Sequence, residues 1–140
     1  MYRSTVQLGA ADIVPFLSRP RVLIVDDYPG ARYRRMRHLL DAGGFDVAEE
    51  SLGREALGRL GREHFDLLVV DLHLPDISGL DVCRRAREQA GYATIPILLM
   101  SAVSETDEAT RLASEAGATA FVPDSADGEA FVSAVKKALG

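Results

Sequence analysis

Three aspartates stand at the ends of two apolar segments, where carboxylates could do chemistry together. Asp26 and Asp27 follow residues 22–25, and Asp71 follows residues 67–70. Both segments are typical of buried strands in a parallel sheet, and parallel strands end at the same edge, so we expect the three carboxylates to converge. Clustered carboxylates repel one another, and a divalent cation relieves that repulsion. Because the ligands are all oxygens, the sequence predicts a Mg²⁺ site.

A hydroxyl is expected at the same edge. Ser101 follows the apolar segment 95–100, and Ala102 leaves room beside it. The chain has no glycine-rich phosphate loop and no G-x-G-x-x-G after the first strand, which argues against a nucleotide site and gives a flavin site little support.

The elements that must position these residues alternate along the chain. Apolar segments predict strands at residues 22–25, 45–48, 65–70, 95–100 and 118–122. Helical periodicity predicts helices at about residues 29–42, 54–62, 78–86, 104–116 and 127–139, with Ser78 and Ser104 as N-caps. This alternation predicts an α/β fold: a flavodoxin-like (βα)5 doubly wound parallel sheet with strand order 2-1-3-4-5.

Size and composition favour one ordinary globular domain. The chain has 140 residues, 47% hydrophobic and 26% charged, and its net charge of −5 argues against a general nucleic-acid binder. The single cysteine, Cys83, forms no internal disulfide. No apolar segment could span a bilayer and no signal peptide is evident, so we expect a cytoplasmic protein. Residues 1–20 are expected to be an N-terminal extension, a tail or a short helix, and residues 21–140 the domain.

Residues 21–140 resemble the receiver domain of response regulators, the phosphorylatable half of two-component signalling. The resemblance rests on four motifs that occur in order at strand ends: VLIVDD at 22–27, VVDLHLPDISGL at 69–80, LLMSA at 98–102 and GATAFV at 117–122. Together they cover nearly all of the chain after the extension.

The resemblance implies a role for each acidic residue. Asp71 would accept a phosphoryl group from a phosphohistidine on a histidine kinase or histidine phosphotransferase. Asp27, Asp71 and the backbone carbonyl of His73 would bind Mg²⁺ directly, and Asp26 mainly through water. The protein would therefore take part in phosphoryl transfer to its own aspartate without turning over a separate substrate.

The resemblance also implies a switch. Ser101 would hydrogen-bond a phosphoryl oxygen, and Phe121 would turn inward as Ser101 moves. Each has a simpler interpretation: Ser101 as a hydroxyl bonded to a nearby carbonyl, and Phe121 as a core residue. The His73 side chain is either a solvent-facing loop residue or a group that influences the phosphoryl lifetime.

One position departs from the family pattern. The lysine expected after the fifth strand falls on Asp124, followed by Ser125, and the family's proline is displaced to Pro123. No lysine or arginine occurs from residue 112 to residue 135. Without that cation, stabilisation of the phosphoryl group should be weaker and the switch less tightly coupled. If Asp124 faces the site it could strengthen metal binding; otherwise it points to solvent from a rebuilt loop.

Two classes of function therefore stay open. One is a single-domain response regulator that accepts a phosphoryl group on Asp71. The alternative is a phosphorylation-independent, receiver-like binding module. A magnesium-dependent phosphohydrolase is a distant third, because it needs a further general acid and only His73 is a candidate.

The expected partners follow from the surface. The first predicted helix carries Arg32, Arg34, Arg35, Arg37 and His38, which form either a solvated face or a docking face for an acidic patch on the kinase or phosphotransferase. A homodimer could form through the fourth helix, fifth strand and fifth helix. No DNA-binding domain follows Gly140, so the protein would act by contact with an unknown downstream protein, unless the chain is part of a longer regulator.

Overall fold

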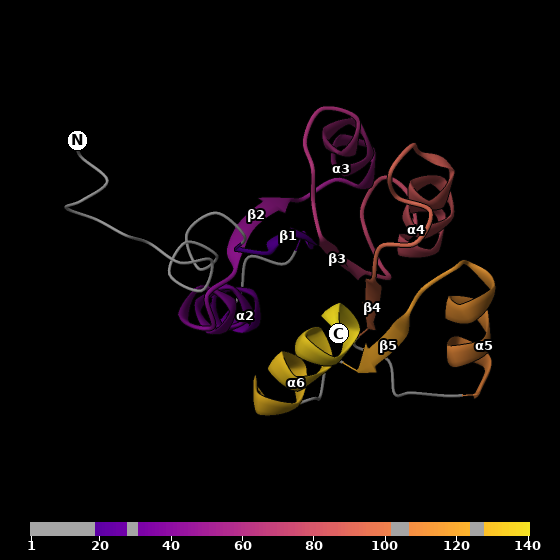
Figure 1. Ribbon diagram of the computed structural model, residues 1–140. Helices are drawn as coiled ribbons and strands as arrows, with labels where there is room; N and C mark the ends of the chain where they lie inside the picture. The colour runs from indigo at the N-terminus through magenta and orange to yellow at the C-terminus, as the bar shows by residue number, and fades with distance from the viewer. Residues whose placement is uncertain (1–18, 28–30, 102–106, 124–127) are drawn as a thin grey trace, which may run out of the picture.

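The computed structural model describes residues 19–27, 31–101, 107–123 and 128–140, with the backbone alone for residues 31–33 and 35 (Figure 1). In this part of the chain five parallel strands form one sheet in the order β2-β1-β3-β4-β5. The strands are β1 (Arg21–Val25), β2 (Asp46–Glu50), β3 (Leu67–Asp71), β4 (Ile97–Ser101) and β5 (Ala120–Pro123). The predicted strand order is confirmed.

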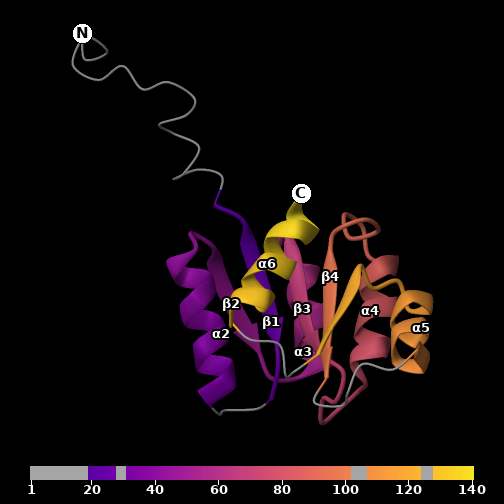
Figure 2. The same ribbon diagram turned by 90° about the horizontal axis from the view of Figure 1, so that it is seen from below.

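Helices cover both faces of the sheet, as the views in Figures 1 and 2 agree. The described helices are α2 (Ala31–Ala42), α3 (Gly53–Leu60), α4 (Gly79–Glu88), α5 (Asp107–Glu115) and α6 (Gly128–Leu139). Helices α2 and α6 pack on one face, and α3, α4 and α5 pack on the other. The structure is the doubly wound, flavodoxin-like fold that the alternating pattern predicts.

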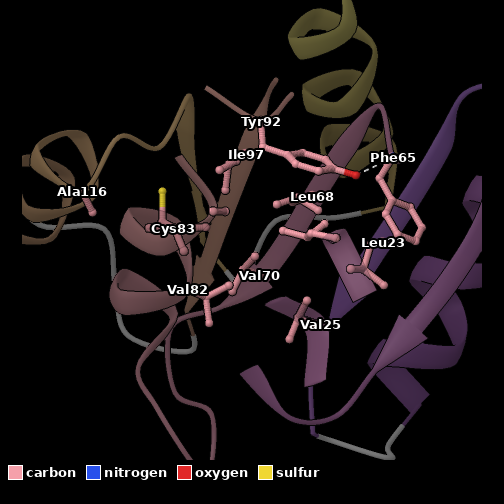
Figure 3. Close-up of a cluster of buried hydrophobic side chains, with 14 of the residues drawn as sticks. Leu23, Val25, Phe65, Leu68, Val70, Val82, Cys83, Tyr92, Ile97 and Ala116 are labelled. Carbon is pink, nitrogen blue, oxygen red and sulfur yellow. Dashed lines mark hydrogen bonds between the residues drawn. The ribbon is translucent and has the colours of Figure 1, made fainter. Parts of the chain in front are cut away.

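The core has two halves because successive strand residues point to opposite faces. Leu23 and Val25 of β1 face α3 and α4, whereas Val22 and Ile24 face α2 and α6. All four side chains are fully buried. Figure 3 shows the first half, in which side chains of β1, β3 and β4 meet α4 and the buried thiol of Cys83.

Several predicted strand boundaries are wrong by one or two residues. Phe65 was expected in the third strand, but its backbone N–H donates to the Tyr92 hydroxyl (3.2 Å; Figure 3) instead of to a neighbouring strand. Ile95 precedes β4, and its carbonyl accepts a bond from the Arg87 guanidinium. Ala118 precedes β5, because its N–H bonds the Ala113 carbonyl and completes the end of α5. A prediction from apolar character alone therefore begins these three strands before the residues that hydrogen-bond to neighbouring strands.

The second strand and second helix also differ slightly from expectation. The strand was predicted at residues 45–48, and β2 runs from Asp46 to Glu50, because Phe45 still bonds the Leu40 carbonyl at the end of α2. The helix was predicted at residues 54–62, and α3 ends at Leu60, with a turn closed by bonds from Gly61 and Arg62.

Within the described residues, no helix is both long and apolar enough to cross a membrane. The predicted N-cap Ser104 lies outside the described residues, as do residues 1–18 of the extension.

Candidate functional site

The site lies at the carboxyl ends of β1 and β3, which are adjacent and in register, with Val25 opposite Val70. Asp26 follows β1, and Asp71 is the last residue of β3, so the pairing brings their carboxylates to the same edge. One carboxylate oxygen from each of Asp26, Asp27 and Asp71 lies within 4.8 Å of the others. Asp26 is buried, Asp71 is half-buried and Asp27 is exposed, so the cluster opens to solvent on one side. The strand ends are at the lower edge of the molecule in Figure 2.

The chemistry of this cluster fits a hard divalent cation. The three side chains offer only carboxylate oxygens, which are the ligands that Mg²⁺ prefers. The exposed side of the cluster leaves room for the water ligands that Mg²⁺ retains. Three anions within this distance also repel one another, and a cation among them would remove that repulsion.

The backbone after β3 is held in a defined turn. The His73 N–H donates to the Asp71 carboxylate (Oδ1, 3.1 Å), and the Leu72 N–H donates to the Met100 carbonyl of β4 (2.8 Å). The Gly79 N–H in turn donates to the Leu72 carbonyl (2.8 Å), which closes the loop onto the start of α4. These bonds fix both the Asp71 side chain and the backbone that follows it.

Helix α4 begins where the capping pattern predicts. The Ser78 hydroxyl accepts a bond from the Asp81 N–H (3.1 Å), which satisfies one of the free amides in the first turn. The Asp81 carboxylate itself pairs with Arg84 (3.1 Å).

Gly79 permits the close approach of α4 to β3. A Cβ atom at this position would lie 2.3 Å from the Asp71 carbonyl oxygen and 2.8 Å from the Leu72 Cα. Both of these are backbone atoms of the acidic site, so they cannot swing away as a side chain could. Gly79 therefore has a steric role beside the Asp71 backbone.

Ser101 lies on β4, the strand next to β3, and Phe121 lies on β5, on the far side of β4. Ser101 is the last residue of β4 and is 1% exposed; its neighbour Met100 pairs with Asp71 across the sheet. Phe121 of β5 is half-buried and packs against the first half of the core. Its ring lines a cavity of about 160 Å³, together with Leu72, Leu80, Glu108, Ala109, Leu112 and Ala113. The cavity leaves space beside the ring, between α4 and α5.

Some predicted site residues are not brought into the cluster or lie outside the described residues. The His73 side chain is exposed, and only its backbone N–H has a described bond to Asp71. Asp124, at the family's lysine position, lies outside the described residues. On α2, Arg37 pairs with Glu49 (2.6 Å) and with Asp41 (3.7 Å), and His38 is exposed. The side chains of Arg32 and Arg35 are outside the described part.

Sequence reasoning missed Asp76, which lies between Asp71 and α4 in the chain. Its two carboxylate oxygens accept bonds from the Gly53 and Arg54 N–H groups, each at 2.9 Å. Burial opposes ionisation of the Asp76 carboxyl, but hydrogen bonds from the backbone N–H groups of Arg54, Gly53, Ile77 and Asp76 itself together outweigh it and hold its pKa below the ordinary value. One signal was available: Leu52 precedes α3 and has no side-chain oxygen to cap it, so the helix needs a partner from elsewhere.

Comparison with solved structures defines the class of protein. The chemotaxis response regulator CheY4 of Vibrio cholerae is 26% identical in sequence, with a TM-score of 0.80 over 86% of this chain and 99% of that one. A putative response regulator from Chloroflexus aurantiacus is 29% identical, with a TM-score of 0.80 over 86% of this chain and 98% of that one. The sheet order and the acidic edge thus define a flavodoxin-like signalling domain of the CheY kind.

A family model described as the response regulator receiver domain matches residues 22–136. The chain belongs to the response regulator receiver family, the signalling modules of two-component systems.

Curated relatives agree with this membership. The sensor protein EvgS of Escherichia coli K12 is 31% identical over 105 residues, which are 75% of this chain and 8% of EvgS. A protein-glutamate methylesterase/protein-glutamine glutaminase of Hahella chejuensis is 38% identical over 104 residues, 73% of this chain and 29% of that protein. The chain thus spans less than a third of either relative.

Proposed function

We propose that the protein is a phosphoryl-accepting response regulator in which Asp71 is the phosphoacceptor. The observation that carries the proposal is the clustering of Asp26, Asp27 and Asp71 within 4.8 Å at the ends of two adjacent strands. Among the three, Asp71 is half-buried and bonded by the His73 N–H, so its carboxylate is held in one orientation while an approaching phosphodonor can still reach it.

The reaction uses the chain's own carboxylate as nucleophile. An Asp71 oxygen attacks the phosphorus of a phosphohistidine on a kinase or phosphotransferase. The new O–P bond forms as the P–N bond breaks, and the imidazole nitrogen keeps the electron pair. The product is an acyl phosphate on Asp71, which water later hydrolyses. No separate substrate is turned over.

Magnesium is the cofactor that the oxygen-only cluster fits. Asp27, Asp71 and the His73 carbonyl would hold the ion directly, and Asp26 would act through a bound water. A bound Mg²⁺ would neutralise charge on the phosphoryl group and on the carboxylates. The protein's own contribution is to position the Asp71 carboxylate and the Ser101 hydroxyl, which would donate a hydrogen bond to the transferred phosphoryl group.

Ser101 and Phe121 would report the phosphorylated state. The Ser101 hydroxyl lies on the strand next to Asp71 and would donate to a phosphoryl oxygen. A shift of the β4 end would make room for Phe121 to turn inward, and the cavity beside its ring supports such a movement. Asp124 supplies no cation at the family's lysine position, so this coupling should be weaker than in receivers that have the lysine.

Residues 21–140 would form the receiver unit, and residues 1–20 an extension. Helix α2, with Arg34, Arg37 and His38, would contact an acidic patch on the kinase or phosphotransferase. Output would pass by protein contact to a downstream partner, with homodimerisation through α5, β5 and α6 as one route. EvgS is named a sensor protein, and a Rhizobium meliloti relative is named a transcriptional regulatory protein, which fits a module that serves different outputs.

The second candidate is a receiver-like module whose contacts do not depend on phosphorylation. The absence of lysine and arginine between residues 112 and 135 of the sequence favours it, because a phosphoryl group would lack its usual cationic partner.

A phosphorylation assay separates the two candidates. The protein is incubated with acetyl phosphate, with Mg²⁺ or with a chelator, and its intact mass is measured. We expect one added phosphoryl mass that needs Mg²⁺ and is lost in Asp71→Asn, whereas Asp81→Asn remains competent. An unchanged mass in the presence of Mg²⁺ would favour the phosphorylation-independent module.

A further inference from the structure

The loop between β3 and α4, residues 72–78, carries the His73 backbone next to Asp71 and is attached at both ends. At its start, the Leu72 N–H bonds the Met100 carbonyl of β4. At its far end, the Gly79 N–H bonds the Leu72 carbonyl. Residues 73–78 lie between these attachments, where a further attachment would restrict their position more tightly.

Asp76 provides that attachment by bonding the N-terminus of α3. Oδ1 accepts from the Gly53 N–H and Oδ2 from the Arg54 N–H, each at 2.9 Å. The preceding residue, Leu52, offers the helix no side-chain cap. Asp76 thus caps a helix 22 and 23 residues away in sequence, with a negative charge at the positive end of the helix dipole.

Packing reinforces these bonds. Gly53 is buried, and a Cβ atom there would lie 2.6 Å from Ile77 Cγ1 and 2.7 Å from Val82 Cγ2. The start of α3 therefore lies directly against the loop and the first turns of α4, without space for a side chain. The charged bonds and the close packing act at the same place, so α3 and the loop are held as one unit.

We propose that Asp76 is a positioning residue for the acidic site: by fastening loop 72–78 to α3, it fixes the His73 backbone relative to Asp71. This inference rests on the proposed function of Asp71 as phosphoacceptor. Asp76 lies five residues beyond Asp71 and acts through the loop, so it need not touch the phosphoryl group or the cation. Helix α3 thereby helps to hold loop 72–78 in position beside Asp71.

The first test needs no metal. Amide hydrogen exchange is measured in the chelated protein for wild type, Asp76→Ala and Asp76→Asn, with Asp81→Asn as the matched control. Asp81 carries the same charge nearby, but it pairs with Arg84 and does not hold α3. We expect the Gly53, Arg54, His73 and Gly79 amides to exchange at least about tenfold faster in Asp76→Ala.

The Asn variant keeps one acceptor oxygen, so exchange in Asp76→Asn should be intermediate, and exchange in Asp81→Asn should equal the wild type. Thermal unfolding checks that each variant is folded. If the His73 and Gly79 amides keep wild-type protection in Asp76→Ala, or if Asp81→Asn exposes them equally, the inference is wrong.

The second test uses Mg²⁺ alone as the probe, titrated calorimetrically into the same variants. Partners that orient a ligating group typically contribute tenfold or more to metal affinity, so Asp76→Ala should bind Mg²⁺ about tenfold more weakly. Unchanged affinity in that variant would overturn the inference. If wild-type protein shows no Asp71-dependent binding, the proposed function fails instead, and the exchange measurement alone decides whether Asp76 positions the loop.

Discussion

Replacement of Gly79 by alanine tests whether the approach of α4 to β3 builds the acidic site. The added methyl carbon would lie 2.3 Å from the Asp71 carbonyl oxygen, 2.8 Å from the Leu72 Cα and 2.9 Å from the Asp71 carbonyl carbon. All three are backbone atoms at the end of β3. Neither element can yield by a rotamer change, so Gly79→Ala must push the start of α4 and the Asp71 backbone apart.

The size of the displacement sets the expected cost. Cβ atoms essentially never approach within 3.0 Å, so the two elements must separate by about 0.7 Å or more, and overpacking of this kind costs about 2–3 kcal/mol. For a domain of this size each kcal/mol lowers the unfolding temperature by roughly 3–5 °C, which predicts a fall of roughly 6–15 °C. Because the displaced atoms belong to Asp71, the affinity for Mg²⁺ should also fall, by about tenfold.

Gly58→Ala is the matched control. Gly58 lies within α3, and a Cβ atom there would approach only the Arg62 side chain, at 3.5 Å. Alanine in a helix should stabilise the protein by about 0.5–1 kcal/mol and leave Mg²⁺ affinity unchanged. Thermal unfolding by circular dichroism and Mg²⁺ titration are measured on both variants. If Gly79→Ala unfolds at the wild-type temperature and binds Mg²⁺ normally, the steric argument is refuted.

The folded-state pKa of Asp76 lies below its ordinary value of 3.8, so its contribution to stability is present above that pH and is lost as pH falls through the folded pKa. In urea unfolding, the free energy of unfolding of the wild type should exceed that of Asp76→Asn by a large margin at neutral pH and by a smaller margin towards pH 3. A difference in unfolding free energy that does not change with pH would contradict this linkage. Burial raises the pKa of the Cys83 thiol against the smaller opposing effects of Arg87 and Arg84. The thiol should therefore react with a disulfide reagent at least about a thousandfold more slowly in the native protein than in the urea-unfolded protein. Comparable rates in the two states would show that the Cys83 thiol is accessible in the native protein. The Arg87 guanidinium donates hydrogen bonds to the Gly117, Tyr92 and Ile95 carbonyls. Arg87→Lys should therefore lower the free energy of unfolding in urea by about 2 kcal/mol, whereas Arg85→Lys, at an exposed position, should leave it almost unchanged. Equal stability of the two variants would count against this role of Arg87.

The sheet was predictable because its strands carry strong local signals. The continuous apolar segment of β1 predicts burial on both faces, and its residues 22–25 are fully buried. The Ser78 cap is also a local pattern, and it is present as predicted. Strand ends were less predictable, because Phe65 and Ile95 have strand-like character but bond Tyr92 and Arg87 instead of neighbouring strands.

The acidic cluster could be predicted because it follows from strand topology. Once β1 and β3 are taken as parallel neighbours, residues at their carboxyl ends must meet. The attachment of Asp76 to α3 could not be predicted in this way, since it joins residues 22 and 23 positions apart through loop geometry. The steric role of Gly79 likewise depends on the distance between α4 and β3, which no sequence pattern encodes.

Calorimetric titration with Mg²⁺ tests most directly whether carboxylates from two strands share one cation. Wild-type protein should bind one ion, and Asp27→Asn and Asp71→Asn should each weaken that binding about tenfold or more. Asp41→Asn, an exposed change on α2, should bind as the wild type does. If Asp27→Asn and Asp71→Asn both retain wild-type affinity for Mg²⁺, the acidic edge is not a magnesium site and the account of phosphoryl transfer is contradicted.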